Sequence, residues 1–168
     1  MGPHQQRFLL LEQGIGAGLF NVALNAAIAW AMFRHLDVVP LWGQQSIAGD
    51  TLGTCFFLPF FTALIVTPLV RRRVRRGDLE ALPWTRDSHP LLGWLPAGTA
   101  RRALALGGLC LVAAGPPTVL ALHGLSIAQL ALWPFVVFKA AFAGLLALLV
   151  TPVISLWALA EPAVGLPR

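Results

Sequence analysis

One charged side chain, Lys139, lies inside an otherwise uncharged stretch of the sequence, LALWPFVVFKAAFAGLLALLVTP, which runs from Leu130 to Pro152. On insertion scales, an ammonium group at the centre of a bilayer costs about 2.5–3.5 kcal/mol, so it needs a partner or a water-filled cavity. Charged residues that persist in membrane spans commonly belong to ion pathways, proton relays or counter-ion pairs. Lys139 is therefore the first candidate for a functional residue.

Four polar residues on other apolar stretches are candidate partners for this ammonium group. Counted from the outer ends of the stretches, Asn25 lies at about the same depth as Lys139, and Asp50 lies about one helical turn nearer the surface. Helical side chains lean toward the N-terminus, which points the ammonium outward, toward Asp50. We predict a buried polar site of Asn25, Asp50, Thr54 and Lys139, with Asn21 on the same face as Asn25, that binds an ion or small ligand. The alternative is that Lys139 snorkels to the outer headgroups.

The third apolar stretch contains LVAAGPPTVL, in which Pro116 and Pro117 are adjacent. Neither proline has an N–H to donate, so the carbonyl groups of Val112 and Ala113 lose their helical partners. Inside a membrane such carbonyls must be satisfied by other protein groups or by water in a cavity. The two prolines predict a helix break whose free carbonyls join the polar site.

Small residues indicate where helices approach closely. Gly14, Gly18, Asn21 and Asn25 follow i, i+4, i+7, i+11 spacing and share one helical face. Gly144 lies on a similar small-residue face of the fourth stretch. Glycines spaced in this way let a second backbone come near, and asparagines hydrogen-bond across the contact. We predict that these faces pack against one another within the chain or between copies of it.

The composition requires a membrane. Of the 168 residues, 57% are hydrophobic and 11% are charged, whereas soluble domains carry roughly a quarter charged residues. Four stretches, 8–33, 47–70, 103–122 and 131–158, have the roughly 20 residues needed to cross a hydrocarbon core of about 30 Å. The sequence predicts an all-α membrane protein with four transmembrane helices. Its single lysine, eleven arginines and abundant alanine, leucine, glycine and proline are typical of a GC-rich bacterial genome.

Charge asymmetry predicts the orientation. The segment between the second and third stretches carries eight arginines, and the loops on the opposite side carry Arg34 alone. By the positive-inside rule this segment and both termini are cytoplasmic, which makes the chain a multi-pass protein of the bacterial inner membrane. We expect part of the segment, 81–98, to lie on the inner surface, with the arginines near anionic lipids rather than nucleic acid. The eight are Arg71, Arg72, Arg73, Arg75, Arg76, Arg86, Arg101 and Arg102.

The two halves of the sequence repeat a pattern. LIVTPLV near the end of the second stretch matches LLVTPVI near the end of the fourth, with Thr67-Pro68 corresponding to Thr151-Pro152. We divide the chain into two tandem hairpins, 1–84 with a basic exit and 85–168 with an interfacial loop. Around FFTALIVTPLVRRRVRR the first half resembles a group of short, uncharacterised bacterial two-helix membrane proteins. The tandem plan is also similar to small transmembrane-pair efflux transporters, although their acidic and Trp-Asn motifs are absent.

Three classes of function remain for such a chain. A transporter or channel would use the polar site, and four short helices would then need a second copy to enclose a path. A non-catalytic subunit or scaffold would assemble with itself or with a partner protein through the Gly/Asn faces. An enzyme is disfavoured, because the sequence has no nucleophile elbow, phosphate loop or paired membrane carboxylates. Its two cysteines, Cys55 and Cys110, lack metal-binding spacing, so neither a metal nor a cofactor is expected.

Overall fold

Four long helices make up most of the computed structural model, which describes residues 7–82, 96 and 98–160. The first helix starts as a π-helix, η1 (Phe8–Gly16), and continues as α2 (Ala17–Phe33); the others are α3 (Ile47–Arg75), α5 (Thr99–Gly124) and α6 (Leu132–Ala160). Each of the four is long and apolar enough to cross a membrane. The prediction of a helical, multi-pass membrane protein is confirmed. Most of the predicted interfacial segment, 81–98, and both chain termini lie outside the described residues.

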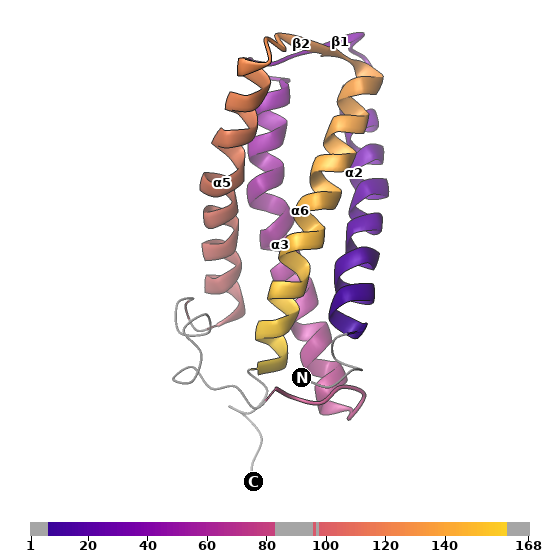
Figure 1. Cartoon of the computed structure of the whole chain (residues 1–168), viewed down its shortest axis with the longest axis vertical. Helices are drawn as coiled ribbons and strands as arrows, with labels where there is room; N and C mark the ends of the chain where they lie inside the picture. The colour runs from indigo at the N-terminus through magenta and orange to yellow at the C-terminus, as the bar shows by residue number, and fades with distance from the viewer. Residues whose placement is uncertain (1–6, 83–95, 97, 161–168) are drawn as a thin grey trace.

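The two ends of the bundle differ. At one end, β1 (Val38–Pro40) and β2 (Gln129–Ala131) pair as a short antiparallel ribbon, with Val39 opposite Leu130. We call this the ribbon end (Figure 1). At the other, the last turn of α3 carries Arg72, Arg73 and Arg75, and we call it the arginine end. Cations in a last turn interact favourably with the helix dipole.

Local sequence explains how α3 begins. Ser46 precedes the helix in an extended conformation, and its Oγ accepts a hydrogen bond from the Gly49 N–H at 3.2 Å. This N-cap satisfies one of the N–H groups that every helix start leaves without a partner. The same hydroxyl donates to the Gly43 carbonyl at 2.9 Å, which fixes the entering chain. Asp50 falls in the first turn, where the helix dipole favours a negative charge.

The start of the first helix departs from the expected geometry. Residues of η1 form a nine-residue π-helix, whereas π turns occur mostly as single bulges inside α-helices. Gly14 and Gly16 lie within this stretch, and a Cβ built on either would come within 3.3–3.4 Å of a carbonyl oxygen five residues earlier. The glycines therefore suit the local winding, which positions the arginine-end part of the helix against α6.

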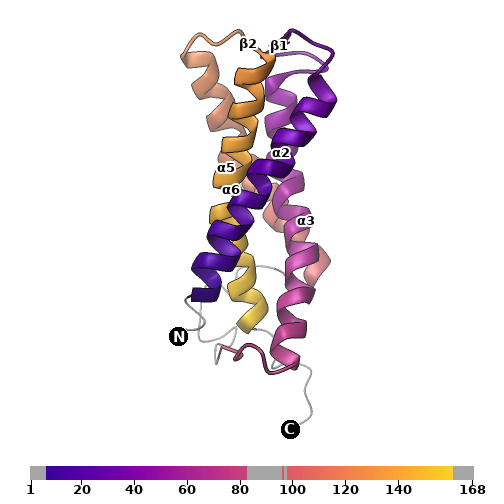
Figure 2. The same cartoon turned by 90° about the vertical axis from the view of Figure 1, so that its right-hand side faces the viewer.

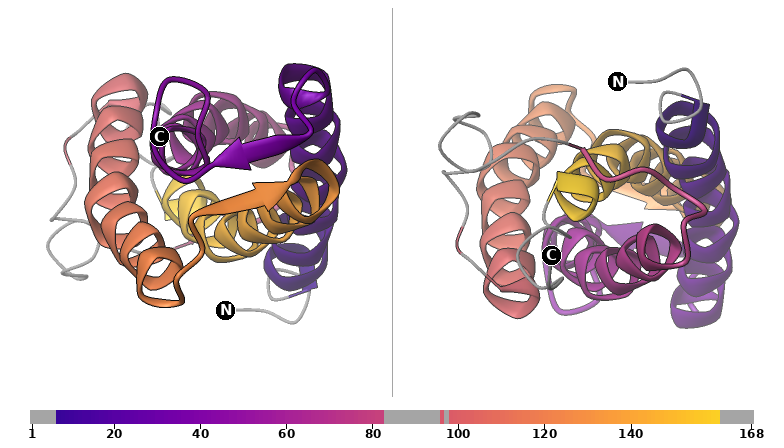
Figure 3. Two further views of the ribbon diagram at one scale, coloured as in Figure 1. Left: turned by 90° about the horizontal axis from the view of Figure 1, so that it is seen from above. Right: turned by 90° about the horizontal axis from the view of Figure 1, so that it is seen from below.

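Helices from different halves of the sequence are the main packing partners. α2 packs on α6, α3 packs on α5, and α3 and α6 form the centre of the bundle. Viewed along the bundle, α3 and α6 lie between α5 and α2 (Figure 3), and α2 crosses α6 obliquely (Figure 2). The first helix of each half, α2 or α5, thus has its main partner in the other half of the sequence.

The apolar core is divided along the length of the bundle. One cluster around Phe33, Ile47 and Phe135 lies beneath the ribbon, and a second around Val70, Ile154 and Leu159 lies toward the arginine end. After α3 the chain returns to α6, where the Leu82 N–H donates to the Leu159 carbonyl at 2.9 Å. The polar residues described next interrupt this core in the half nearer the ribbon.

Candidate functional site

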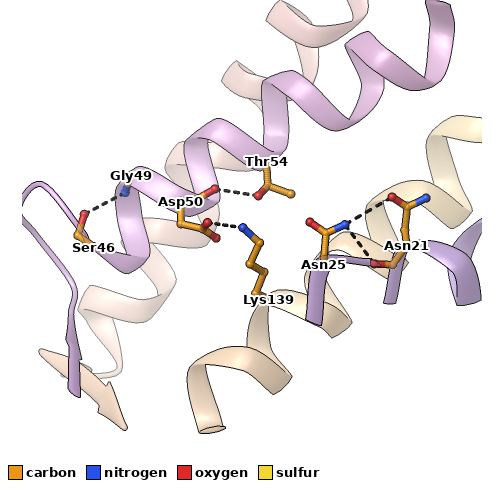
Figure 4. A network of polar contacts seen from close by, with 7 residues as sticks. All are labelled: Asn21, Asn25, Ser46, Gly49, Asp50, Thr54 and Lys139. Atoms are coloured by element: carbon orange, nitrogen blue, oxygen red, sulfur yellow. Dashed lines mark hydrogen bonds and ion pairs between the residues drawn. The ribbon is translucent and has the colours of Figure 1, made fainter. Parts of the chain in front are cut away.

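Lys139 and Asp50 form a buried ion pair between α6 and α3. The Lys139 Nζ donates to the Asp50 Oδ1, and the two side chains are 6% and 8% exposed. Figure 4 shows the lysine extended toward the carboxylate rather than along its own helix to the bundle end. The structure therefore favours the predicted pairing over snorkelling. The pair lies two turns into α6 and one turn into α3, which places it in the half of the bundle nearer the ribbon.

The other predicted members of the site lie nearby but use their hydrogen bonds locally. The Thr54 hydroxyl donates to the Asp50 carbonyl at 2.8 Å. The Asn25 Nδ2 donates to the Asn21 carbonyl at 3.1 Å, and the Asn21 Nδ2 donates to the carbonyl of Ala17 at 2.9 Å. Such local bonds satisfy part of the hydrogen-bonding capacity of these side chains within their own helices. The asparagines are thus next to the ion pair without being bonded to it (Figure 4).

A cleft of about 730 Å³ joins these residues. Its walls are α2, with the end of η1, and α3, while Lys139 and Thr151 of α6 also line it. Asn21, Asn25, Asp50 and Thr54 all line the same cleft. The walls are otherwise mainly apolar, and their outer edges are exposed. These exposed edges are formed by Phe20, Leu24, Ile28, Met32, Phe57, Phe61 and Ile65.

Several polar groups of the cleft retain bonding capacity. An ammonium group has three N–H donors, and in the described part of the chain the Lys139 ammonium has Asp50 as its hydrogen-bond partner. Within the same described residues, the Thr151 Oγ1 is buried with no hydrogen-bond partner. The pair can therefore bind a further group with acceptor oxygens, water included, without giving up its own contact.

Sequence reasoning missed the arginine-end part of the cleft. There the Arg73 guanidinium pairs with Glu12 at 2.7 Å, and the Ser155 hydroxyl donates to the Gln13 Oε1 at 2.8 Å. Glu12 and Gln13 line the cleft, so these contacts join both of its walls and α6. One signal was present in the sequence, since Glu12 is an acidic residue in an otherwise apolar span.

The predicted helix break does not form. α5 runs from Thr99 to Gly124 through Pro116 and Pro117 as one helix. The residue with one of the freed carbonyls, Val112, is 72% exposed. α5 packs mainly on α3, and the residues that line the described cleft come from the other helices and the segment before α3. These carbonyls are consequently not part of the Lys139 site. Membrane helices tolerate proline, because local adjustment and neighbouring groups compensate for the lost hydrogen bond.

The predicted packing glycines lie at the α2–α6 contact. A Cβ built on Gly144 would come within 2.4 Å of the Val22 Cγ2 and 3.3 Å of the Gly18 carbonyl oxygen. A Cβ on Gly18 would meet the Gly144 carbonyl oxygen at 3.3 Å, and one on Gly14 would meet the Pro152 Cγ at 3.7 Å. Gly18 and Gly144 thus allow α2 to approach α6, whereas Gly14 of η1 lies at an ordinary contact distance from Pro152. The α2–α6 contact forms one side of the cleft.

No protein-family model, curated protein or solved structure matches the chain. Among the described residues, no group of three or more His, Cys, Asp and Glu side chains is placed to hold a metal ion. The two cysteines, Cys55 and Cys110, are free thiols. The functional groups of the site are those of the ion pair and of the cleft that it lines.

Proposed function

We propose that this protein moves a small solute across a bacterial inner membrane, with the Asp50–Lys139 pair as the binding site and a second copy completing the path. The observation that carries the proposal is that the pair lines an open cleft instead of being sealed in the core. A buried ion pair adds little to the stability of a fold, because well-packed apolar residues in its place stabilise the fold as well or better. Ionisable residues inside membrane spans are rare and usually mark a functional site.

The proposed orientation places the arginine end in the cytoplasm. Arg71, Arg72, Arg73, Arg75 and Arg76 follow one another at the end of α3, and the positive-inside rule supports a cytoplasmic position for them. Anionic headgroups of the inner leaflet would then contact this end. The ion pair would lie in the outer half of the bilayer, within reach of solutes that enter from outside.

Membrane vesicles with matched variants test this proposal. Vesicles with the wild-type chain and with the double variant Lys139→Met/Asp50→Leu are incubated in a cell extract, washed, and analysed by untargeted mass spectrometry. A pH-sensitive dye inside the vesicles reports proton movement in parallel. We expect at least one compound, or the proton signal, to differ between the two. Equal compound profiles and equal proton signals would refute transport through this pair.

A second candidate function is that of a non-catalytic subunit. The observation that favours it is the row of exposed aromatic and aliphatic side chains on α3, Phe57, Phe61 and Ile65, which a helix of a partner protein or a second copy would cover. Cysteines introduced at these three positions separate the two functions. Disulfide-linked dimers, or cross-links to one partner protein in native membranes, would support assembly through this face.

A further inference from the structure

We propose that the cleft between α2 and α3 binds an uncharged, single-chain amphiphile, with its oxygen-bearing head at Lys139 and its hydrocarbon chain along the cleft walls. This rests on the proposed function, since it names the class of solute that the site takes. It draws on the dimensions of the cleft, its charges and the unused hydrogen-bonding capacity of the ammonium group.

The dimensions fit one hydrocarbon chain. The α3 side of the cleft runs from Ser46 to Val66, which at about 1.5 Å per residue is a length of about 30 Å. Its volume of about 730 Å³ lies in the range of about 300–1,000 Å³ that is typical of small-molecule sites, so a single hydrocarbon chain fits along it. A helix of the same length, about 10–12 Å across with its side chains, would occupy about 2,400–3,400 Å³ and does not fit within it.

The charges favour an uncharged head. The charged residues that line the described cleft are Glu12, Asp50 and Lys139. Asp50 and Lys139 neutralise each other, and Glu12 is paired with Arg73. A ligand with a further formal charge would have no counter-charge in the cleft, and burying an unpaired charge in an apolar environment is costly. A carboxylate or phosphate would also face the Asp50 carboxylate.

The Lys139 ammonium group supplies the hydrogen-bond donors for the head of the amphiphile. Lys139 has three N–H donors and one protein partner among the described residues. Hydroxyl, ester and carbonyl oxygens accept such hydrogen bonds and carry no charge. Next to the pair, the exposed edges of Leu24, Ile28 and Phe57 lead from the polar site to the surrounding lipid. An amphiphile can therefore enter sideways from the membrane, head and chain together.

Photo-cross-linking of the full-length chain in lipid nanodiscs tests this site. The probes are three C18 compounds with the same diazirine-bearing chain: a monoacylglycerol, a fatty acid and a quaternary amine. Peptide mass spectrometry maps the labelled residues. We expect the monoacylglycerol to label the cleft-lining positions of α2 and α3 at least fivefold more than either charged probe. Lys139→Met/Asp50→Leu should remove most of this preference.

A matched pair of glycine variants separates cleft binding from general lipid contact. Gly53 lines the cleft, and a Cβ there meets Phe57 at an ordinary 4.0 Å; a Cβ on Gly108 of α5, outside the cleft lining, meets nothing within 4 Å. Gly53→Leu should reduce monoacylglycerol labelling of the cleft at least fivefold, and Gly108→Leu should leave it unchanged. Thermal unfolding checks that both variants remain folded.

Three results would overturn the inference. Equal labelling by all three probes would mean ordinary lipid contact, and a preference for a charged probe would refute the uncharged head. Absence of labelling together with a dimer cross-linked through Phe57→Cys would show that a second copy fills the cleft. The vesicle assay distinguishes this inference from the proposed function. Labelling of the cleft without a compound difference between the vesicles would refute transport but support the binding site. A compound difference without labelling would refute amphiphile binding but support transport.

Discussion

Removal of either charge of the Asp50–Lys139 pair should destabilise the protein far more than removal of both. Breaking a buried pair leaves an uncompensated charge and typically costs about 3–5 kcal/mol, while apolar replacement of both partners is close to neutral. The side chains are 6% and 8% exposed, but they line a cleft, so partial solvation places the expected cost near about 3 kcal/mol for each single variant, Lys139→Met and Asp50→Leu.

The two single variants should differ from each other. In Lys139→Met, the remaining carboxylate still lies in the first turn of α3, where the helix dipole contributes about 0.3–1 kcal/mol in favour of a negative charge. In Asp50→Leu, the lysine is left two turns from the N-terminus of α6, where the helix dipole gives a positive charge no stabilisation. Asp50→Leu should therefore be the more destabilising of the two by up to about 1 kcal/mol.

The assay is reversible unfolding of the wild type, both single variants and the double variant in mixed micelles at one pH. We expect the double variant to lie within about 1 kcal/mol of the wild type. With single-variant costs of about 3 kcal/mol each, this requires a coupling energy of at least about 5 kcal/mol, well above the roughly 0.3–0.5 kcal/mol within which independent sites add. If the free-energy changes of the single variants simply add, the two side chains do not stabilise each other and the site described above does not exist in the membrane.

Three further predictions concern the frame around the site. Gly144→Val should destabilise the protein by about 1–3 kcal/mol in the same unfolding assay, because the new side chain overpacks the α2–α6 contact. Gly108→Val, where the new side chain points into open space, is the matched control. An equal loss of stability in both variants would disprove close packing at Gly144. Ser46→Ala should cost about 1 kcal/mol through loss of the N-cap, with Ser46→Asp close to wild type; equal losses would show that the cap is unimportant. Cysteine labelling of intact cells should reach Gln44→Cys from outside and Asp78→Cys only after permeabilisation, and the reverse pattern would invert the proposed orientation.

The pairing of Asp50 with Lys139 could be predicted from sequence because apolar stretches of known length fix the depth of each charge. The cleft could not be predicted in this way. In a membrane, a leucine or phenylalanine face is equally suited to lipid and to a neighbouring helix, so Phe57 and Phe61 gave no sign that they border a cavity. The shared face of the asparagines predicts cross-helix bonds, but each amide bonds one turn back along α2 instead, an alternative that a helix always offers to such side chains. Pro116 and Pro117 predict a break, but α5 continues through them, because sequence alone does not show which neighbouring groups compensate for the lost hydrogen bonds in a membrane helix.

The packing of helices from one half of the sequence on helices from the other half affects how the protein assembles during synthesis. Asp50 and Lys139 are 89 residues apart in the chain, and synthesis proceeds at about 5–20 residues per second. The carboxylate is therefore made roughly 5–20 s before its counter-ion exists. During that interval α2 also lacks α6, the helix against which its Gly18 packs. The first half must wait in the bilayer, or beside the insertion machinery, as separate helices. A chain that stops after α3 would leave an unpaired acid in the membrane, an exposed feature by which quality control can recognise an unfinished protein.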